Sequence, residues 1–376
     1  MPAPSPFLEE RHVRIRSYLH DQGLDALVVT HAPNILYLSN HAGSAGIVVL
    51  TRDAVLLLAD FRYAGAVGQL QTSPQACPGL ALRDVPASYD EALVALLAEI
   101  GASRVGIEAA HLPVARFEWL RRTVEARKLA IELVQTERVV ERFRVIKDAW
   151  EVGALRESAA RLGAVAEAAF QAVRAGAAER QVAAAIEQAL RIAGFDRMAF
   201  DTLVASGPHS ALPHHRAGDR ILQVGDLVVL DFGGFLDGYC CDLTRTVVVG
   251  TPGPDVTRMY EAVRDAQAAA VAAVRPAIPA SDVDGAARAV LEERGLGQAF
   301  GHGTGHGLGL EVHEEPRVGK PRPDMPAMVL EPGMVFTIEP GAYLSGWGGV
   351  RIEDDVLVTK DGCEVLTSVT RDLLIR

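Results

Sequence analysis

The chain of 376 residues carries 48 acidic and 37 basic side chains, which gives a formal net charge of −11, and 49% of its residues are hydrophobic. This composition is typical of a globular protein, and the acidic balance argues against a general nucleic-acid binder. Because no apolar run approaches the roughly 18 residues of a membrane span, and the start lacks a signal-peptide core, we expect a soluble, cytoplasmic protein without a membrane partner.

The first third of the chain alternates helix and strand signals. A helical pattern over residues 9–22 ends at Gly23, a favourable C-cap. Two further helical patterns follow at residues 90–100 and 115–127. The apolar segments of strand length are residues 26–30, 46–50, 54–59 and 105–107. This alternation predicts a small α/β N-terminal domain, residues 1–136, with a largely parallel or mixed sheet.

A charged segment without glycine or proline follows and predicts a helical linker over residues 137–152. The rest of the chain, residues 153–376, is expected to form one larger α+β domain. Its long, alanine-rich helices are predicted at residues 154–172, 179–192, 256–274 and 281–294.

The larger domain contains an internal repeat. Residues 222–233 align without gaps with residues 330–341, 108 positions later. Each copy is predicted to be an apolar strand that ends in a carboxylate, and a second strand with another carboxylate follows. The four carboxylates are Asp231 and Asp242 in the first copy, and Glu339 and Glu353 in the second. The repeat predicts two halves related by a pseudo-twofold axis, each giving a two-stranded unit to a shared sheet.

Four carboxylates that converge at such an axis would repel one another, and bound cations are the usual remedy. Six of the eleven histidines lie between residues 209 and 313, and the densest stretch is the glycine-rich segment 301–313. Carboxylates with one imidazole suit two ions of Mn²⁺, Co²⁺ or Zn²⁺, which would polarise a carbonyl for hydrolysis. The histidines expected to be ordinary surface or core residues are His12, His20, His31, His41, His111 and His209.

Five segments resemble motifs of the pita-bread metallopeptidases, most closely the proline-specific branch of aminopeptidase P and prolidase. They are residues 230–233, 241–246, 301–314, 337–341 and 350–355. The resemblance implies an α+β pita-bread catalytic domain with internal pseudo-twofold symmetry, preceded by a smaller, creatinase-like α/β domain. It also implies an exopeptidase that hydrolyses the bond between an N-terminal residue and a following proline.

The resemblance further implies which residues act. The implied metal ligands are Asp231, Asp242, His306, Glu339 and Glu353. Asp242 and Glu353 would bridge both ions, and Glu339 would also carry a proton.

Other positions match residues around the metals. His214 would line the substrate pocket, whereas His302 and His313 would hold the scissile carbonyl and the developing oxyanion. Thr244 and Arg351 would support the ligating carboxylates. Arg317 either reaches a substrate carboxylate or is a plain surface arginine.

We therefore expect an Xaa-Pro aminopeptidase with two divalent ions per chain, with Mn²⁺ as the first expectation and Co²⁺ or Zn²⁺ as alternatives. The expected partners are short peptides with proline at the second position and a second copy of the chain in a homodimer. Prolidase (Xaa-Pro dipeptidase) uses the same ligands and is the main alternative. More distant alternatives are a metal-free binding protein, a creatinase-like hydrolase and a methionine aminopeptidase, the last of which resembles only the C-terminal part.

Overall fold

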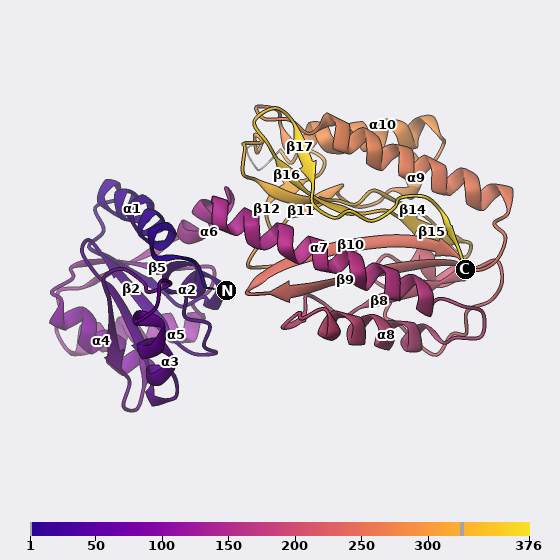
Figure 1. The fold of residues 1–376 in the computed structure, drawn as a ribbon. Helices are drawn as coiled ribbons and strands as arrows, with labels where there is room; N and C mark the ends of the chain where they lie inside the picture. The colour runs from indigo at the N-terminus through magenta and orange to yellow at the C-terminus, as the bar shows by residue number, and fades with distance from the viewer. Residues whose placement is uncertain (1, 324–326) are drawn as a thin grey trace. The chain divides into compact units, whose positions relative to one another are not determined.

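The computed structural model describes residues 2–323 and 327–376. The chain divides into two compact units, Met1–Arg144 and Val145–Arg376, which are described separately (Figure 1). The segment expected as a linker contains the boundary between them, because α6 (Val139–Arg144) ends the first unit and α7 begins at Ala149 in the second.

The first unit is built on a six-stranded mixed sheet with the order β4-β3-β2-β1-β5-β6. Its strands are β1 (Ala26–Val29), β2 (Ile47–Thr51), β3 (Val55–Ala59), β4 (Leu80–Asp84), β5 (Arg104–Glu108) and β6 (Glu132–Thr136). Its other helices are α1 (Ser5–Asp21), α2 (Ala32–Ser39), α3 (Phe61–Gln71), α4 (Tyr89–Glu99) and α5 (Val114–Ala126). The predicted α/β domain with a mixed sheet is confirmed, although α2, α3, β4 and β6 were not anticipated.

The second unit contains two five-stranded sheets and a separate hairpin. The first sheet consists of β7 (Arg197–Met198), β8 (Leu203–Ser206), β9 (Leu227–Leu236), β10 (Tyr239–Val248) and β18 (Leu374–Ile375). The second consists of β11 (Gly305–Gly307), β12 (Glu314–Val318), β13 (Val335–Ile338), β16 (Asp354–Val358) and β17 (Cys363–Val365). The hairpin pairs β14 (Gly341–Leu344) with β15 (Gly348–Arg351).

Two pairs of helices cover these sheets, in agreement with the four predicted helices. They are α7 (Ala149–Ala172) with α8 (Glu179–Ile192), and α9 (Pro254–Ala273) with α10 (Ala280–Glu293). The first pair shares a hydrophobic core with β9 and β10, and the second shares one with β13, β15 and β16. Two short 3₁₀ turns complete the unit, η1 (Gly207–Ala211) and η2 (Gly297–Ala299).

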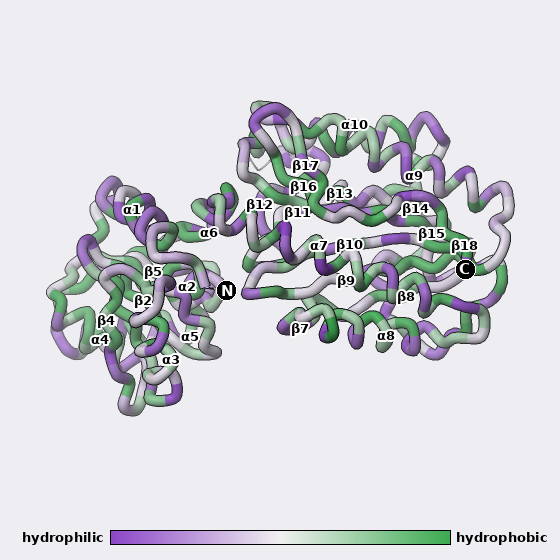
Figure 2. The backbone as a smooth tube through the Cα atoms, viewed as in Figure 1, coloured by the Kyte–Doolittle hydropathy of each residue, from purple (hydrophilic) through white to green (hydrophobic). Residues whose placement is uncertain are grey.

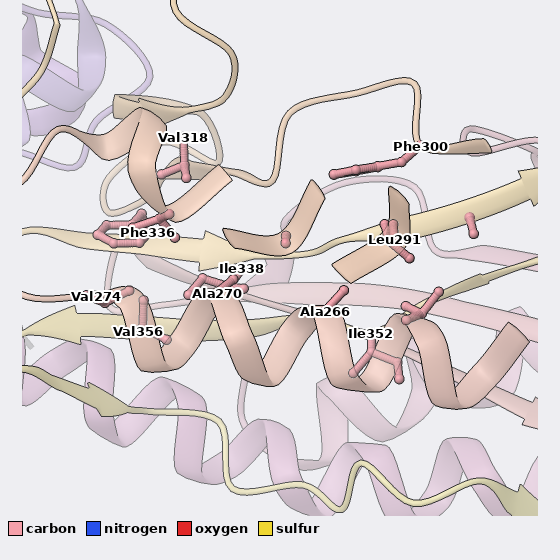
Figure 3. Close-up of a cluster of buried hydrophobic side chains, with 14 of the residues drawn as sticks. Ala266, Ala270, Val274, Leu291, Phe300, Val318, Phe336, Ile338, Ile352 and Val356 are labelled. Atoms are coloured by element: carbon pink, nitrogen blue, oxygen red, sulfur yellow. The ribbon is translucent and has the colours of Figure 1, made fainter. Parts of the chain in front are cut away.

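The buried side of α9 illustrates how each core forms. Figure 2 shows α9 and α10 changing between hydrophilic and hydrophobic along their length, as expected for helices with one buried face. Figure 3 shows Ala270 of α9, and Val274 directly after the end of α9, close to Phe336 and Ile338 of β13, and all four are buried. No helix within the described residues is both long and apolar enough to cross a membrane.

The internal repeat predicted from the sequence is confirmed in the backbone. Gly225 and Gly333, which occupy the same place in the two copies, have nearly equal φ angles of +95° and +94°. Only glycine adopts such angles without strain. The N–H of Leu222 donates to the carbonyl of Ala177, and in the second half the N–H of Leu330 donates to that of Ile278.

The prediction that the two halves contribute to one shared sheet is wrong. β10 runs beside the segment 351–355, and we call this boundary between the two halves the seam. Most of the hydrogen bonds across the seam involve a side chain. The backbone N–H of Asp242 donates to the Asp355 carboxylate at 3.0 Å, and the Thr246 hydroxyl donates to the Arg351 carbonyl at 2.9 Å. One backbone bond, from Glu353 N–H to the Thr244 carbonyl, joins them. The halves therefore form separate sheets because side chains interrupt the ladder.

Candidate metal centre

The hairpin of β9 and β10 positions the carboxylates of the first half. Its turn, Asp237-Gly238, has φ angles of +53° and +88°, as a two-residue type I′ turn requires. The resulting register sets Thr244 opposite Asp231, and Asp242 opposite Gly233. Because directly opposed residues lie on the same face of a hairpin, both carboxylates and the threonine project from one side. The repeat had suggested that Asp231 lies at the end of its strand, but it lies within β9.

The glycines around His306 allow its strand to fit between two neighbours. A Cβ atom at Gly305 would lie 1.8 Å from the Thr337 carbonyl oxygen, and one at Gly307 would lie 2.1 Å from the Glu315 carbonyl oxygen. The sequence suggested that these glycines let the backbone approach a ligand. At these two positions, the close neighbour is the adjacent strand, and glycine is required so that β11 can carry His306.

The carboxylates of the second half lie at strand ends. Glu339 directly follows β13, as predicted, and its N–H donates to the Thr304 carbonyl at 2.7 Å. Glu353 was expected within a strand over residues 350–358, but it lies between β15 and β16. That break places Glu353 at the seam, beside β10.

All five predicted ligands come together. Oxygen or nitrogen atoms of Asp242, His306 and Glu353 lie within 4.8 Å of one another. The Nε2 atom of His306 is 3.6 Å from Oε1 of Glu339. Asp231 is close enough for its charge to raise the pKa of Asp242. Two strands of the first half and three segments of the second half thus meet at one cluster.

The buried carboxylates of this cluster repel one another, and a bound cation would compensate their negative charge. Burial raises the pKa of Asp242 well above its usual range, and the charge of Asp231 adds to the effect. Burial and the charge of Asp242 likewise raise the pKa of Glu353. Burial raises the pKa of Glu339 to about 8, although Arg351 opposes it. Each shift reflects a carboxylate deprived of compensating charge.

The donor atoms themselves fit divalent metal ions. Among the described residues, the Oδ1 atom of Asp242 is buried and has no hydrogen-bond partner. Burial lowers the pKa of His306 to about 4, so its imidazole is neutral and able to ligate at pH 7. A buried set of carboxylates with one neutral imidazole is suited to ions such as Mn²⁺, Co²⁺ or Zn²⁺.

Thr244 and Arg351 contact the ligand set. The Thr244 hydroxyl donates to the Glu353 carboxylate and accepts from Nε of Arg351 at 3.1 Å. The same guanidinium donates to Asp231 and, at 3.0 Å, to the hydroxyl of Tyr343. These bonds fix the orientation of one carboxylate from each half.

Sequence reasoning missed two contributors near the site. A lone tyrosine gives no signal, yet Tyr343 in β14 lies between Arg351 and His302. Lys147 forms a buried ion pair of 3.1 Å with Glu314, the residue that follows His313 in the chain. The pair joins positions far apart in the chain, so no local pattern indicates it.

The three histidines expected around the substrate lie near the cluster. His214 is close enough to influence the pKa of both His302 and His313, which burial lowers. His313 is partly buried but still accessible to solvent, and its ring centroid is 4.4 Å from that of His306. Arg317 is exposed and lies directly opposite His306 in the β11–β12 register.

The hydrogen bonds of His302 fix its tautomer. Its Nδ1 is 2.7 Å from the Gly303 carbonyl oxygen, which only accepts, so Nδ1 carries the proton. Burial lowers the pKa of His302 to about 4, and the neutral ring therefore accepts from the Tyr343 hydroxyl through Nε2 at 3.0 Å. In this arrangement the solvent-accessible His313 is better placed than His302 to donate to a substrate oxygen.

Comparison with known proteins identifies the two units. The family model of the creatinase/prolidase N-terminal domain matches residues 11–146, and that of metallopeptidase family M24 matches residues 153–360. The chain belongs to metallopeptidase family M24. The expected resemblance and the pita-bread architecture are thereby confirmed, and this M24 member is a metallopeptidase whose family implies divalent metal ions.

Similar proteins span nearly the whole chain. This M24 peptidase is 35% identical over 369 residues to an Xaa-Pro dipeptidase of Pyrococcus horikoshii, with 98% of this chain and 99% of that protein covered. It matches the structure of an Xaa-Pro dipeptidase from Bacillus anthracis with a TM-score of 0.91 at 34% identity, covering 98% and 100% of the two chains. An X-Pro aminopeptidase from Thermotoga maritima gives a TM-score of 0.87 at 31% identity, covering 96% and 100%.

We expect metal binding by this M24 peptidase to tighten as the pH rises from 6 to 8. The carboxyl of Glu339, whose pKa is raised to about 8 by burial, is protonated below that pH and must lose its proton to ligate. Each displaced proton changes the apparent Kd by about tenfold per pH unit. Calorimetric titration of the metal-free chain with Mn²⁺, in buffers of different ionisation enthalpy, measures both the apparent Kd and the number of protons released. A Kd independent of pH, without proton release, would contradict this expectation.

Proposed function

We propose that this M24 peptidase is an Xaa-Pro dipeptidase (prolidase), which hydrolyses the bond between an N-terminal residue and a C-terminal proline. Identity of 34–35% to two Xaa-Pro dipeptidases across nearly the full chain supports the proposal. The sequence alone put Xaa-Pro aminopeptidase first and prolidase second, and these relatives favour the reverse order. Xaa-Pro aminopeptidase stays the second candidate because the Thermotoga maritima structure is also similar.

Two divalent ions per chain are proposed as cofactors, with Mn²⁺ in first place and Co²⁺ or Zn²⁺ as alternatives. The proposed ligands are Asp231, Asp242, His306, Glu339 and Glu353, of which Asp242 and Glu353 would bridge. Their convergence and the orphaned Oδ1 of Asp242 support this assignment. When bound, such ions act as Lewis acids on the scissile carbonyl and lower the pKa of water.

Glu339 is the proposed proton carrier. The nitrogen of an Xaa-Pro bond, like that of any peptide bond, must receive a proton before it can leave, and here proline leaves as a secondary amine. The carboxylate of Glu339 would take this proton from the attacking water and deliver it to that nitrogen. Its position at the end of β13, 3.6 Å from His306, supports this role.

Other side chains would bind and orient the substrate. We propose that His313 donates to the oxyanion that develops on the scissile carbonyl, and that His214 lines the pocket for the proline ring. Arg317 is proposed to bind the C-terminal carboxylate of the dipeptide. Its exposure and its place opposite His306 support that role, and within the described residues it has no ion-pair partner.

A peptide panel with Mn²⁺ supplied tests the proposal. The peptides are Xaa-Pro, Xaa-Pro-Yaa, Xaa-Ala and Xaa-Ala-Yaa. We expect hydrolysis of Xaa-Pro alone. Comparable cleavage of Xaa-Pro-Yaa would favour the aminopeptidase, and equal rates for proline and alanine would refute proline specificity.

Replacing Arg317 by alanine should raise KM for Xaa-Pro by about 10- to 100-fold, which corresponds to the ~1.5–3 kcal/mol of a hydrogen bond to a charged group. The amide Xaa-Pro-NH₂ has the same scissile bond but no carboxylate, so its KM should change little. Steady-state kinetics with both substrates measure the difference. An equal rise for the two substrates would show that Arg317 does not bind the carboxylate.

We also propose a homodimer located in the cytoplasm, on the basis of the resemblance to the proline-specific branch. Sedimentation equilibrium of the purified chain tests the oligomeric state. A monomer at micromolar concentration would rule out the dimer.

A further inference from the structure

A second group of potential ligands lies outside the candidate dinuclear centre. Glu179, the first residue of α8, is buried, and its carboxylate faces two histidines from the segment that follows β8. Nδ1 of His209 is 3.0 Å from Oε1, and Nε2 of His215 is 3.0 Å from Oε2. Ligand atoms of all three lie within 4.8 Å of one another. None of them belongs to the five proposed ligands.

The carboxylate of Glu179 is oriented by further bonds. Oε1 accepts from the N–H and hydroxyl of Ser206 at 2.8 and 2.7 Å, and Oε2 accepts from the N–H of Gly218 at 3.2 Å. Although burial opposes it, the bonds from Ser206 and both histidines keep the pKa of Glu179 below its usual range. Arg220 pairs with Asp226 at 2.5 Å, donates to the Ser206 hydroxyl at 2.6 Å, and is near enough for the charge of Glu179 to act on it. An ionised, doubly supported carboxylate of this kind is typical of a metal ligand.

We propose that Glu179, His209 and His215 form a third metal site for a borderline divalent transition-metal ion such as Zn²⁺. Two imidazoles and one carboxylate favour Zn²⁺, Ni²⁺ or Cu²⁺ over Mg²⁺ and Ca²⁺. The His209 side chain is 36% exposed and that of His215 is 17% exposed, which leaves a route for the ion and space for a water ligand. His209 was expected to be an ordinary residue, so this role goes beyond the sequence.

The ion would link α8 to the segment that carries His214. Glu179 belongs to the helix, and His209 and His215 flank His214 in the chain. The inference does not depend on the proposed peptidase function, because its ligands are separate from those of the dinuclear centre and its test compares the Zn²⁺ content of variants that share that centre.

The test must separate metal ligation from hydrogen bonding, since each histidine also donates to Glu179. Asparagine at 209 and glutamine at 215 can keep an N–H near the positions of Nδ1 and Nε2, yet an amide is a poor ligand for Zn²⁺. The test protein is therefore the double variant His209→Asn/His215→Gln. His20→Ala, in α1, is the matched control because its side chain is 80% exposed.

Each protein is stripped of metal, incubated with excess Zn²⁺, desalted and analysed by plasma mass spectrometry. We expect three Zn²⁺ per chain in the wild type and in His20→Ala, and one fewer in the double variant. Electron paramagnetic resonance with one equivalent of Cu²⁺ should show coupling to two nitrogens in the wild type that the double variant lacks. Equal Zn²⁺ content and equal nitrogen coupling in wild type and double variant would overturn the proposal. If the dinuclear centre did not bind its two ions, the Zn²⁺ content of the wild type and of both variants would instead fall by the same amount.

Discussion

Replacing Asp242 by asparagine is expected to abolish metal binding at the dinuclear centre while stabilising the metal-free protein. The carboxylate is buried, its pKa is raised by burial and by Asp231, and its Oδ1 atom has no hydrogen-bond partner among the described residues. A neutral amide of the same size removes the repulsion. Loss of the ions should reduce hydrolysis by more than about 10³-fold, since Lewis-acid stabilisation contributes several kcal/mol.

The two effects can be measured on the same samples. Calorimetric melting of the metal-free proteins should give a higher Tm for Asp242→Asn, by about 2–4 °C for each kcal/mol of repulsion relieved. The matched control is Asp354→Asn, because Asp354 is equally buried but accepts bonds from Arg245 and Arg371 at 2.7 and 2.6 Å. Its removal leaves a buried arginine without its counter-charge and should lower Tm. A lower Tm for both variants would contradict the assigned repulsion.

Replacing Glu339 by glutamine should leave the fold intact and reduce kcat by about 10²- to 10⁴-fold, the usual contribution of a positioned proton carrier. Glutamine keeps the size of the side chain but holds no transferable proton at neutral pH. Metal content must be measured beside kcat, because Glu339 is also a proposed ligand and a loss of ions would lower turnover by itself.

The control for this variant is Glu364→Gln. Glu364 is a surface residue of β17 that pairs with Arg156, and its replacement should leave kcat unchanged. If Glu339→Gln keeps its ions and turns over at the wild-type rate, Glu339 does not carry the proton. If it loses them, activity should be compared at saturating Mn²⁺.

The sequence predicted the long helices well because their signals are local. The extents of α8 and α10 follow from apolar periodicity alone, and α7 begins at a capping box formed by Asp148 and Glu151, a signal that would have set its start. By contrast, α3 contains Gly65 and Gly68, which weaken the helical pattern. β4 was missed because its residues are mostly exposed and lack a buried face.

A metal centre could be predicted because two patterns agreed, a repeat that pairs carboxylates and a histidine-rich segment with regular glycine spacing, and the resemblance to the pita-bread metallopeptidases implied the individual ligands. Contacts between positions far apart in the chain could not be predicted from the sequence. Tyr343 reaches Arg351 and His302 only after β14 and β15 pair, and the cluster at Glu179 requires α8 to meet the segment after β8. Such contacts depend on tertiary packing, which no window of the sequence contains.

The seam between the two sheets has a consequence for mutational tolerance. In a backbone ladder, donors and acceptors belong to the main chain, so most substitutions preserve the pairing. At the seam, the Asp355 carboxylate and the Thr246 hydroxyl take the place of main-chain donors and acceptors. A substitution of either residue therefore removes a hydrogen bond that joins the two sheets. In a saturation mutagenesis scan scored by folded yield, both positions should therefore reject even isosteric changes such as Thr246→Val, whereas Val248, paired within the ladder to Leu227, should accept other β-branched residues.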